Sequence, residues 1–193
     1  MQNKPNYLKT ERKIVNKRQW ALLISAGLIA AILGIGLSSF KHRTTEAKDQ
    51  AVELFLKEEL KGPDGAIHAT KEWRNKILVL NFWASWCPPC VEEMPTLAKT
   101  YSLYKDKNVL FVGIGVDSPS NIRQFLENTP INYPITVNPL EGVNWAKNMG
   151  NPSGGLPFTV LIDEKGVIKK TKLGKISEDE LKSWLDSAIL PSK

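Results

Sequence analysis

Two cysteines separated by two prolines, Cys87 and Cys90, are the residues of this chain best suited to chemistry. They follow an apolar run with β-branched and aromatic side chains, residues 77–83, which predicts a buried strand. The residues after them, 91–94, predict the first turns of a helix. Proline is tolerated at a helix start because the amide it lacks would be unpaired there. We therefore expect Cys87 at a helix N-terminus, with Cys90 one turn inside.

This placement predicts thiol–disulfide exchange. Unpaired amides and the positive end of the helix dipole stabilise a thiolate, which is the form of cysteine that attacks a disulfide. Two cysteines three positions apart can also close a disulfide within the first helical turn. The predicted chemistry is that Cys87 attacks the disulfide of a partner and that Cys90 resolves the resulting mixed disulfide.

A zinc site and a purely structural disulfide are the alternatives to redox chemistry. Structural zinc usually needs four ligands, and the chain has only two cysteines. Its two histidines, His42 and His68, do not have the spacing of a zinc knuckle. We therefore favour redox chemistry and expect no metal and no other cofactor.

The net charge of +6 comes from the N-terminal tail. Residues 1–43 contain eight Lys or Arg and one Glu, whereas the remaining chain contains 18 basic and 19 acidic residues. That remainder has no run of Lys or Arg interleaved with aromatic residues. Nucleic-acid binding is therefore not expected.

Residues 20–40 form an apolar segment without charged side chains, long enough to span a bilayer as a helix. The alternative is a cleaved signal peptide, whose apolar region is usually only about 7–15 residues. Six basic residues precede the segment and two follow it closely, so the positive-inside rule keeps residues 1–19 in the cytoplasm. We predict a single-pass signal anchor in the inner (cytoplasmic) membrane. Residues 41–51 would be a linker, and residues 52–193 would form the catalytic domain on the periplasmic or extracytoplasmic side, where disulfides persist.

The pattern of residues 52–193 predicts strands that alternate with helices. Residues 52–56 and 66–69 are interpreted as an N-terminal β-hairpin around the turn residues 61–65, and residues 119–150 as a central insertion. Further strands are predicted at residues 109–116, 135–137, 158–162 and 167–173, and helices at residues 92–105, 117–128, 141–149 and 177–190. The predicted fold class is α/β, with a central mixed sheet flanked by helices. The cysteines would lie at the carboxyl end of a strand, where the active sites of such sheets collect.

These motifs resemble those of thioredoxin-fold proteins, and in particular the membrane-anchored TlpA/ResA/CcmG group of extracytoplasmic thiol–disulfide oxidoreductases. The resemblance is carried by Asn-Phe-Trp-Ala-Ser-Trp-Cys-Pro-Pro-Cys at residues 81–90 and by residues 92–95, 111–117 and 155–163. It implies a thioredoxin-like fold in which Cys87 is the exposed nucleophile and Cys90 the buried resolving cysteine.

The resemblance also implies a substrate-binding surface around the cysteines. Pro157 matches the cis-proline of the family, which would face the disulfide and leave the backbone of Leu156 free to pair with an extended substrate. Trp86 and Pro88, beside the cysteines, are expected on the docking surface, whereas Trp83 is expected in the core.

Glu93 is the predicted proton carrier. Thioredoxin itself has a buried acid where this chain has Asn81, so that proton shuttle is absent here. Glu93 lies three residues after Cys90 on the same helical face and matches the glutamate of ResA-like proteins. We hypothesise that Glu93 handles the proton of Cys90, with a pKa that burial would raise. The alternative is a solvated helix residue, like Glu92.

The function implied by the resemblance is reduction of protein disulfides outside the cytoplasm, such as those of apocytochrome c or another maturing metalloprotein. Electrons would come from a transmembrane reductant of the DsbD/CcdA type. One alternative is an oxidant of the same fold that inserts disulfides. Another is a metal-binding chaperone that delivers copper through the two cysteines. Copper-delivery relatives of this fold use a Cys-x-x-x-Cys spacing and a distal His, whereas this chain has the shorter spacing and no histidine after His68.

Overall fold

The computed structural model describes residues 46–190 of the chain. The chain divides into two units, Met1–Thr44 and Thr45–Lys193. The predicted tail, the predicted signal anchor and the first part of the predicted linker (residues 1–45) lie outside the described residues, so these assignments stay predictions. Within the part that is described, no helix is both long and apolar enough to cross a membrane.

Five strands form the central sheet, in the order β5-β4-β3-β6-β7. They are β3 (Ile77–Trp83), β4 (Val109–Gly115), β5 (Ile135–Val137), β6 (Phe158–Ile162) and β7 (Ile168–Leu173). β4 is parallel to both β3 and β5, and β6 is antiparallel to both β3 and β7. Every residue of β3 and β4 is buried, as expected for central strands covered on both faces. The predicted mixed sheet is confirmed.

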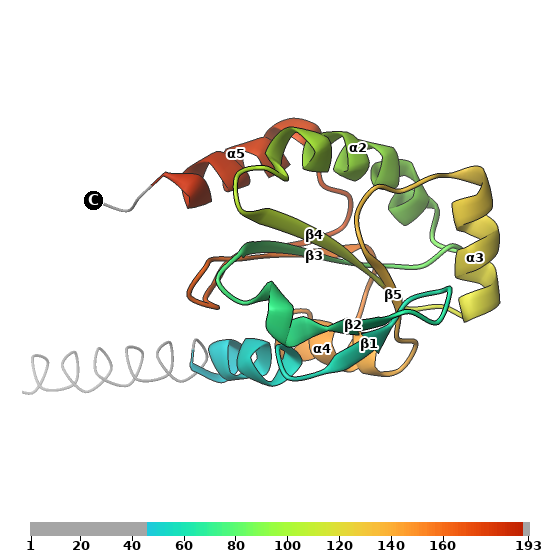
Figure 1. Ribbon diagram of the computed structural model, residues 1–193, viewed down its shortest axis with the longest axis horizontal. Helices are drawn as coiled ribbons and strands as arrows, with labels where there is room; N and C mark the ends of the chain where they lie inside the picture. Colours follow the sequence, from blue (N-terminus) through green and yellow to red (C-terminus); the bar gives the residue numbers. More distant parts are fainter. Residues whose placement is uncertain (1–45, 191–193) are drawn as a thin grey trace, which may run out of the picture. The chain divides into compact units, whose positions relative to one another are not determined.

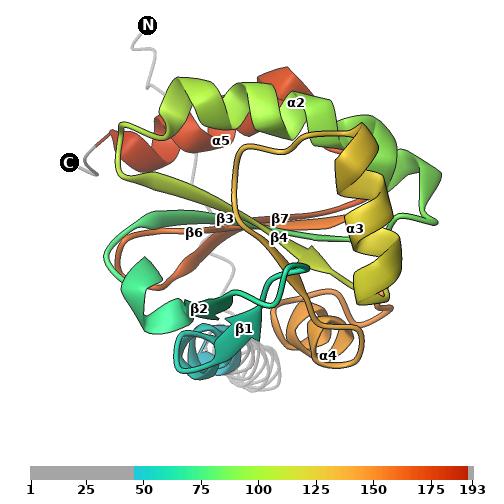
Figure 2. The ribbon, with the colours of Figure 1, turned by 45° about the vertical axis from the view of Figure 1, so that its right-hand side comes forward.

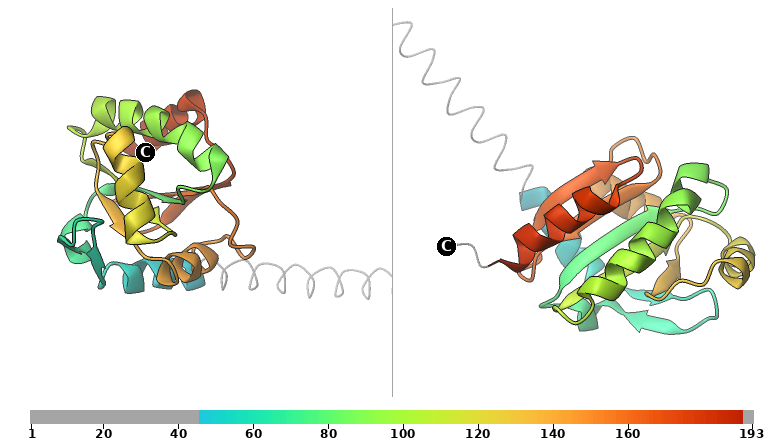
Figure 3. Two further views of the ribbon diagram at one scale, coloured as in Figure 1. Left: turned by 90° about the vertical axis from the view of Figure 1, so that its right-hand side faces the viewer. Right: turned by 90° about the horizontal axis from the view of Figure 1, so that it is seen from above.

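Helices cover both faces of this sheet (Figures 1 and 2). On one face, α2 (Pro88–Tyr104) and α5 (Glu178–Ile189) lie side by side, as the view from above in Figure 3 shows. The opposite face is covered by α4 (Glu141–Asn148) and by a helix over residues 46–55. α3 (Pro119–Asn128) packs its apolar residues into the same core as α2.

The sheet separates two hydrophobic cores. Successive side chains of a strand point to opposite faces. Val79 and Trp83 of β3 therefore belong to the core beneath α2 and α5, which also contains the two cysteines. Leu80 and Phe82 of the same strand belong to the other core. The alternation matters for the site because it decides which β3 side chains can reach the sulfur atoms.

An N-terminal β-hairpin is present, as predicted. It consists of β1 (Glu59–Lys61) and β2 (Ile67–Ala69), which pair antiparallel with Leu60 opposite His68. A short 3-10 helix, η1 (Thr70–Trp73), then leads the chain toward β3.

The predicted first strand of that hairpin, at residues 52–56, is wrong. Residues 46–55 are helical, so the part of the predicted linker from residue 46 onward is helix as well. Val52 and Phe55 are fully buried, and their spacing of three places both on one face of a helix. Val52, Leu54 and Leu56 also alternate with the period of a strand, so over so few residues the two patterns cannot be told apart.

The predicted central insertion, residues 119–150, contains α3, β5 and α4. The helix starts follow the expected capping chemistry. The Ser118 hydroxyl accepts a hydrogen bond from the amide of Asn121 at the start of α3. Ser177 caps α5 in the same way by accepting from the amide of Glu180.

Candidate active site

The two cysteines lie where the chain passes from β3 into α2. Cys87 is the N-cap residue of α2, with an extended backbone at φ −98° and ψ 101°, and prolines occupy the first helical positions. The carbonyl of Cys87 accepts hydrogen bonds from the amides of Cys90 and Val91 at 3.0 and 3.1 Å. The predicted position at the start of a helix is confirmed.

The two sulfurs form a disulfide, with an S–S distance of 2.11 Å and a Cα–Cα distance of 5.3 Å. Cys87 keeps 5% of its surface exposed, whereas Cys90 is fully buried. Trp86, 65% exposed, and the exposed Pro88 flank Cys87 in the chain. A sulfur of another protein can therefore reach only Cys87 of this pair. Among residues 46–190, no cluster of three or more His, Cys, Asp or Glu side chains could hold a metal ion.

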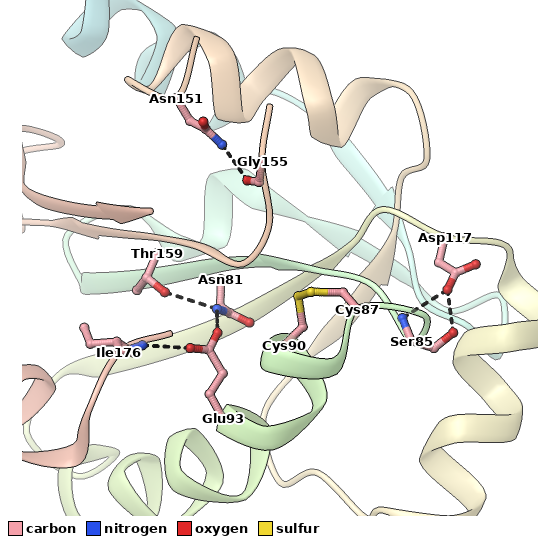
Figure 4. Close-up of a disulfide and its surroundings, with 10 residues drawn as sticks. All are labelled: Asn81, Ser85, Cys87, Cys90, Glu93, Asp117, Asn151, Gly155, Thr159 and Ile176. Carbon is pink, nitrogen blue, oxygen red and sulfur yellow. Dashed lines mark hydrogen bonds between the residues drawn. A yellow bond between two sulfur atoms is a disulfide. The ribbon is translucent and has the colours of Figure 1, made fainter. Parts of the chain in front are cut away.

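Glu93 lies beneath the disulfide in a buried polar network (Figure 4). One carboxyl oxygen, Oε1, accepts a hydrogen bond from Asn81 Nδ2 at 2.8 Å, and the other, Oε2, accepts one from the amide of Ile176 at 2.9 Å. Asn81 Nδ2 also donates to Thr159 Oγ1 at 3.1 Å. The network joins α2, β3, β6 and the segment before α5 behind the buried cysteine.

The pKa of Glu93 lies above its ordinary value of 4.5, chiefly because burial disfavours the charged carboxylate. The hydrogen bonds from Ile176 and Asn81, and the charge of Lys175, lower the pKa without cancelling the effect of burial. Glu93 is therefore not a solvated helix residue like Glu92, which was the alternative to the proton-carrier hypothesis. Its carboxyl group holds a proton at a higher pH than an exposed glutamate does.

A second buried carboxyl group, Asp117, lies on the other side of the disulfide, at the start of the helix predicted over residues 117–128, and was not predicted as a site residue (Figure 4). Its Oδ2 accepts hydrogen bonds from the amide and the hydroxyl of Ser85, at 3.0 and 2.5 Å. Its Oδ1 accepts from the amide of Ser118 and from Asn121 Nδ2. Burial alone would raise the pKa of Asp117, but these four hydrogen bonds together hold it below its ordinary value of 3.8.

Strand register explains why Asp117 meets the cysteine loop. In the parallel pair β3–β4, Trp83 lies opposite Gly115. Two residues further along each chain, Ser85 and Asp117 are brought together at the carboxyl edge of the sheet. A carboxylate directly after the second buried strand was the sequence signal for this contact, but the contact itself depends on the register.

The loop before β6 contains the predicted substrate-binding residues Leu156 and Pro157. The peptide bond between them is cis, as the resemblance implies. The buried Asn151 fixes the approach to this bond, because its Nδ2 donates to the carbonyl of Gly155 at 2.8 Å (Figure 4). The hydroxyl of Ser153 in turn donates to Asn151 Oδ1 at 2.8 Å. A network of internal hydrogen bonds thus holds the loop that presents Leu156.

This chain is similar to known proteins over most of its length. Residues 45–188 match the Redoxin family. The thiol–disulfide oxidoreductase ResA of Geobacillus thermodenitrificans is 29% identical over 93% of this chain and 98% of its own length. ResA of Halalkalibacterium halodurans is 31% identical, over 88% of this chain and 94% of its own. A thioredoxin-related protein of known structure from Neisseria meningitidis serogroup B has a TM-score of 0.61 and 36% identity, and the match covers 67% of this chain and 98% of that one.

The chain belongs to the Redoxin family, as a ResA-like thiol–disulfide oxidoreductase with a thioredoxin-like fold. The predicted family and fold class are confirmed. Its chemistry is dithiol–disulfide exchange through Cys87 and Cys90, which the structure holds at bonding distance.

Proposed function

We propose that this oxidoreductase reduces disulfides of other proteins outside the cytoplasm, in the maturation of cytochrome c or of another metalloprotein. The observation that carries the proposal is the Cys87–Cys90 disulfide at the start of α2, with only Cys87 partly accessible and the buried Glu93 one turn deeper. The similarity to ResA proteins supports a redox use of this pair over a copper-carrying use.

The catalytic cycle starts from the dithiol. The Cys87 thiolate, favoured by the N-terminus of α2, attacks a substrate disulfide and releases one substrate sulfur as its leaving group. Glu93 takes the proton of the Cys90 thiol. The Cys90 thiolate then attacks the Cys87 sulfur, which releases the second substrate sulfur as a thiolate and forms the intramolecular disulfide. The proton held by Glu93 passes to solvent or to this leaving thiolate. Two electrons have passed to the substrate, and a transmembrane reductant of the DsbD/CcdA type would return the enzyme to the dithiol.

Substrate binding is proposed on Trp86, Pro88, Leu156 and Pro157. Among the described residues, neither the amide nor the carbonyl of Leu156 has a hydrogen-bond partner. An extended peptide can use such free backbone groups as it would use the edge of a sheet. The exposed indole of Trp86 offers apolar contact area next to the reactive sulfur.

The location outside the cytoplasm rests on the apolar segment 20–40 and on the basic residues before it. An alkaline phosphatase reporter fused after Lys193 would test it, because this enzyme becomes active only after export. We expect an active fusion that remains in the membrane fraction. An inactive fusion would contradict the proposed location but not the redox chemistry.

The substrate is best identified by trapping it. In full-length Cys90→Ala, the mixed disulfide on Cys87 cannot be resolved, so substrates should accumulate as adducts that dithiothreitol releases. The matched control is Cys87→Ala/Cys90→Ala, which should capture nothing. If Cys90→Ala captures no protein and the wild-type chain binds stoichiometric copper, the chaperone alternative replaces this proposal.

The reduction potential decides the direction of electron flow. Equilibration of the purified full-length chain with glutathione buffers should give a value near that of thioredoxin, about −270 mV. A value near that of DsbA, about −120 mV, would instead assign the chain to the oxidants that insert disulfides.

A further inference from the structure

Asn81 carries a buried oxygen atom without a hydrogen-bond partner. The residue is 2% exposed, and its Nδ2 group already donates to Glu93 and Thr159. Its Oδ1 has no partner among the residues that the structure describes. A buried acceptor left unpaired costs free energy, and most buried polar atoms in proteins are paired. The disulfide form of the enzyme therefore carries a buried acceptor that is not used.

The alternation of side chains along β3 places Asn81 on the same face of the sheet as the two cysteines. Asn81 lies between Val79 and Trp83 in β3, and alternate strand residues share a face. Val79 and Trp83 pack in the core that contains Cys87 and Cys90. In Figure 4, the oxygen of the Asn81 side chain points to the side on which Cys90 lies, while its nitrogen is directed to Glu93 and Thr159.

We infer that Asn81 Oδ1 accepts a hydrogen bond from the thiol of Cys90 whenever the pair is reduced. A disulfide has no S–H group to donate, which accounts for the unpaired oxygen in this form, whereas a thiol is a weak donor. The inference depends on the cycling of Cys87 and Cys90, but not on the direction or location proposed above.

The step balances in atoms and electrons. An incoming dithiol supplies two electrons and two protons, the Sγ–Sγ bond breaks, and the incoming sulfurs become a disulfide. One proton goes to Cys90, where its S–H donates to Asn81 Oδ1. The other stays on Cys87, or passes to solvent when Cys87 is a thiolate. An amide oxygen accepts this hydrogen bond without removing the proton, so Asn81 holds the resting thiol and Glu93 removes its proton.

Infrared spectroscopy of the S–H stretch tests the contact directly. Cys87→Ala leaves Cys90 as the only thiol of the chain, so the full-length variant in mild detergent should show one S–H band, at the lower frequency of a hydrogen-bonded thiol. Adding Asn81→Leu removes the acceptor and should move the band to higher frequency. Adding Asn81→Asp supplies a stronger acceptor and should move it lower.

Glu93→Gln in the same background is the matched control, because it leaves Asn81 Oδ1 in place and should not move the band. A band that moves with Glu93→Gln, or that stays unmoved in Asn81→Leu or in Asn81→Asp, would overturn the inference. In that case the redox function would still stand. Failure of the wild-type disulfide to be reduced by dithiothreitol would instead contradict the function itself.

The thiol–disulfide equilibrium supplies a second readout. The contact stabilises only the dithiol, and Asn81→Leu also removes the unpaired oxygen from the disulfide form. In glutathione buffers, the equilibrium of Asn81→Leu should therefore move toward the disulfide by on the order of tenfold. A shift toward the dithiol, or no shift, would contradict the inference.

Discussion

Glu93 and Asp117 are two buried carboxyl groups on opposite sides of the same disulfide, and their pKa values shift in opposite directions (Figure 4). Burial acts on both and disfavours the charged form of both. Glu93 accepts two hydrogen bonds, and its pKa rises. Asp117 accepts four, from two backbone amides and two side chains, and its pKa falls.

Depth of burial and the number of hydrogen-bond donors together therefore separate the pKa values of the two carboxyl groups. The two donors to Glu93 do not compensate for its burial, so its carboxyl group keeps a proton to a higher pH, as the proposed proton carrier requires. Asp117 is held as a carboxylate that ties Ser85, in the cysteine loop, to Ser118 and Asn121 at the start of α3. The comparison predicts that replacing Glu93 mainly changes catalysis, whereas replacing Asp117 mainly changes stability.

The largest expected effect is on the exchange rate of Glu93→Gln. Glutamine keeps the shape of the side chain but cannot take the proton of Cys90. General acid–base catalysis contributes at least about 100-fold, so the second exchange step should slow by on the order of 100-fold. Stopped-flow tryptophan fluorescence during reduction of a disulfide peptide, measured over a range of pH, checks this. A pH–rate profile identical to that of the wild type would remove Glu93 from the mechanism.

Asp117→Asn should reduce the free energy of unfolding by about 2–3 kcal/mol. An amide offers one acceptor oxygen where the carboxylate offers two, so donors from Ser85, or from Ser118 and Asn121, would face an NH₂ group. Urea denaturation of the oxidised full-length chain measures the loss. The matched control is Asp106→Asn at an exposed position, which should change stability by less than about 0.5 kcal/mol. Equal losses in the two variants would contradict a special role for Asp117.

The pH dependence of stability should have opposite signs for the two carboxyl groups. Above pH 4.5 the unfolded chain releases the Glu93 proton while the folded protein keeps it, so stability falls as pH rises through the raised pKa. The contribution of Asp117 is fully present above pH 3.8 and is lost as pH falls through the lowered pKa.

Urea denaturation across a pH series separates these two contributions. Subtracting the Glu93→Gln curve from that of the wild type should leave a decrease with rising pH. Subtracting the Asp117→Asn curve should leave a decrease with falling pH. Two difference curves with the same slope would mean that the two carboxyl groups do not differ in the way the structure indicates.

Local patterns allowed most of the fold, and the positions of the cysteines, to be predicted from the sequence. The helix start at Cys87 follows from the adjacent prolines, and the caps at Ser118 and Ser177 follow from their side-chain chemistry. The buried strands follow from apolar runs. Residues 52–56 were misread because a single helical turn and a short strand can share one apolar pattern.

The contacts that distinguish the two carboxyl groups could not be predicted in this way, because they join distant parts of the chain. Ser85 and Asp117 are 32 residues apart and meet through the register of β3 and β4. Glu93 and Ile176 are 83 residues apart, and their hydrogen bond requires the segment before α5 to pass beside α2. The helical position of Glu93 was predictable, but the long-range hydrogen bonds that partly offset the effect of burial on its pKa were not.

The smallest expected effect is the loss of stability in Thr159→Val, which measures what one hydrogen bond adds to the network around Glu93. Thr159→Val keeps the shape of the side chain but removes the oxygen that accepts from Asn81 Nδ2, so one buried N–H group loses its partner. The free energy of unfolding should fall by about 1 kcal/mol. The matched control is Thr171→Val at an exposed position of the neighbouring strand β7, where no buried donor is left unpaired. Urea denaturation of the oxidised variants compares them, and a loss in Thr171→Val as large as that in Thr159→Val would mean that this hydrogen bond adds nothing to the network.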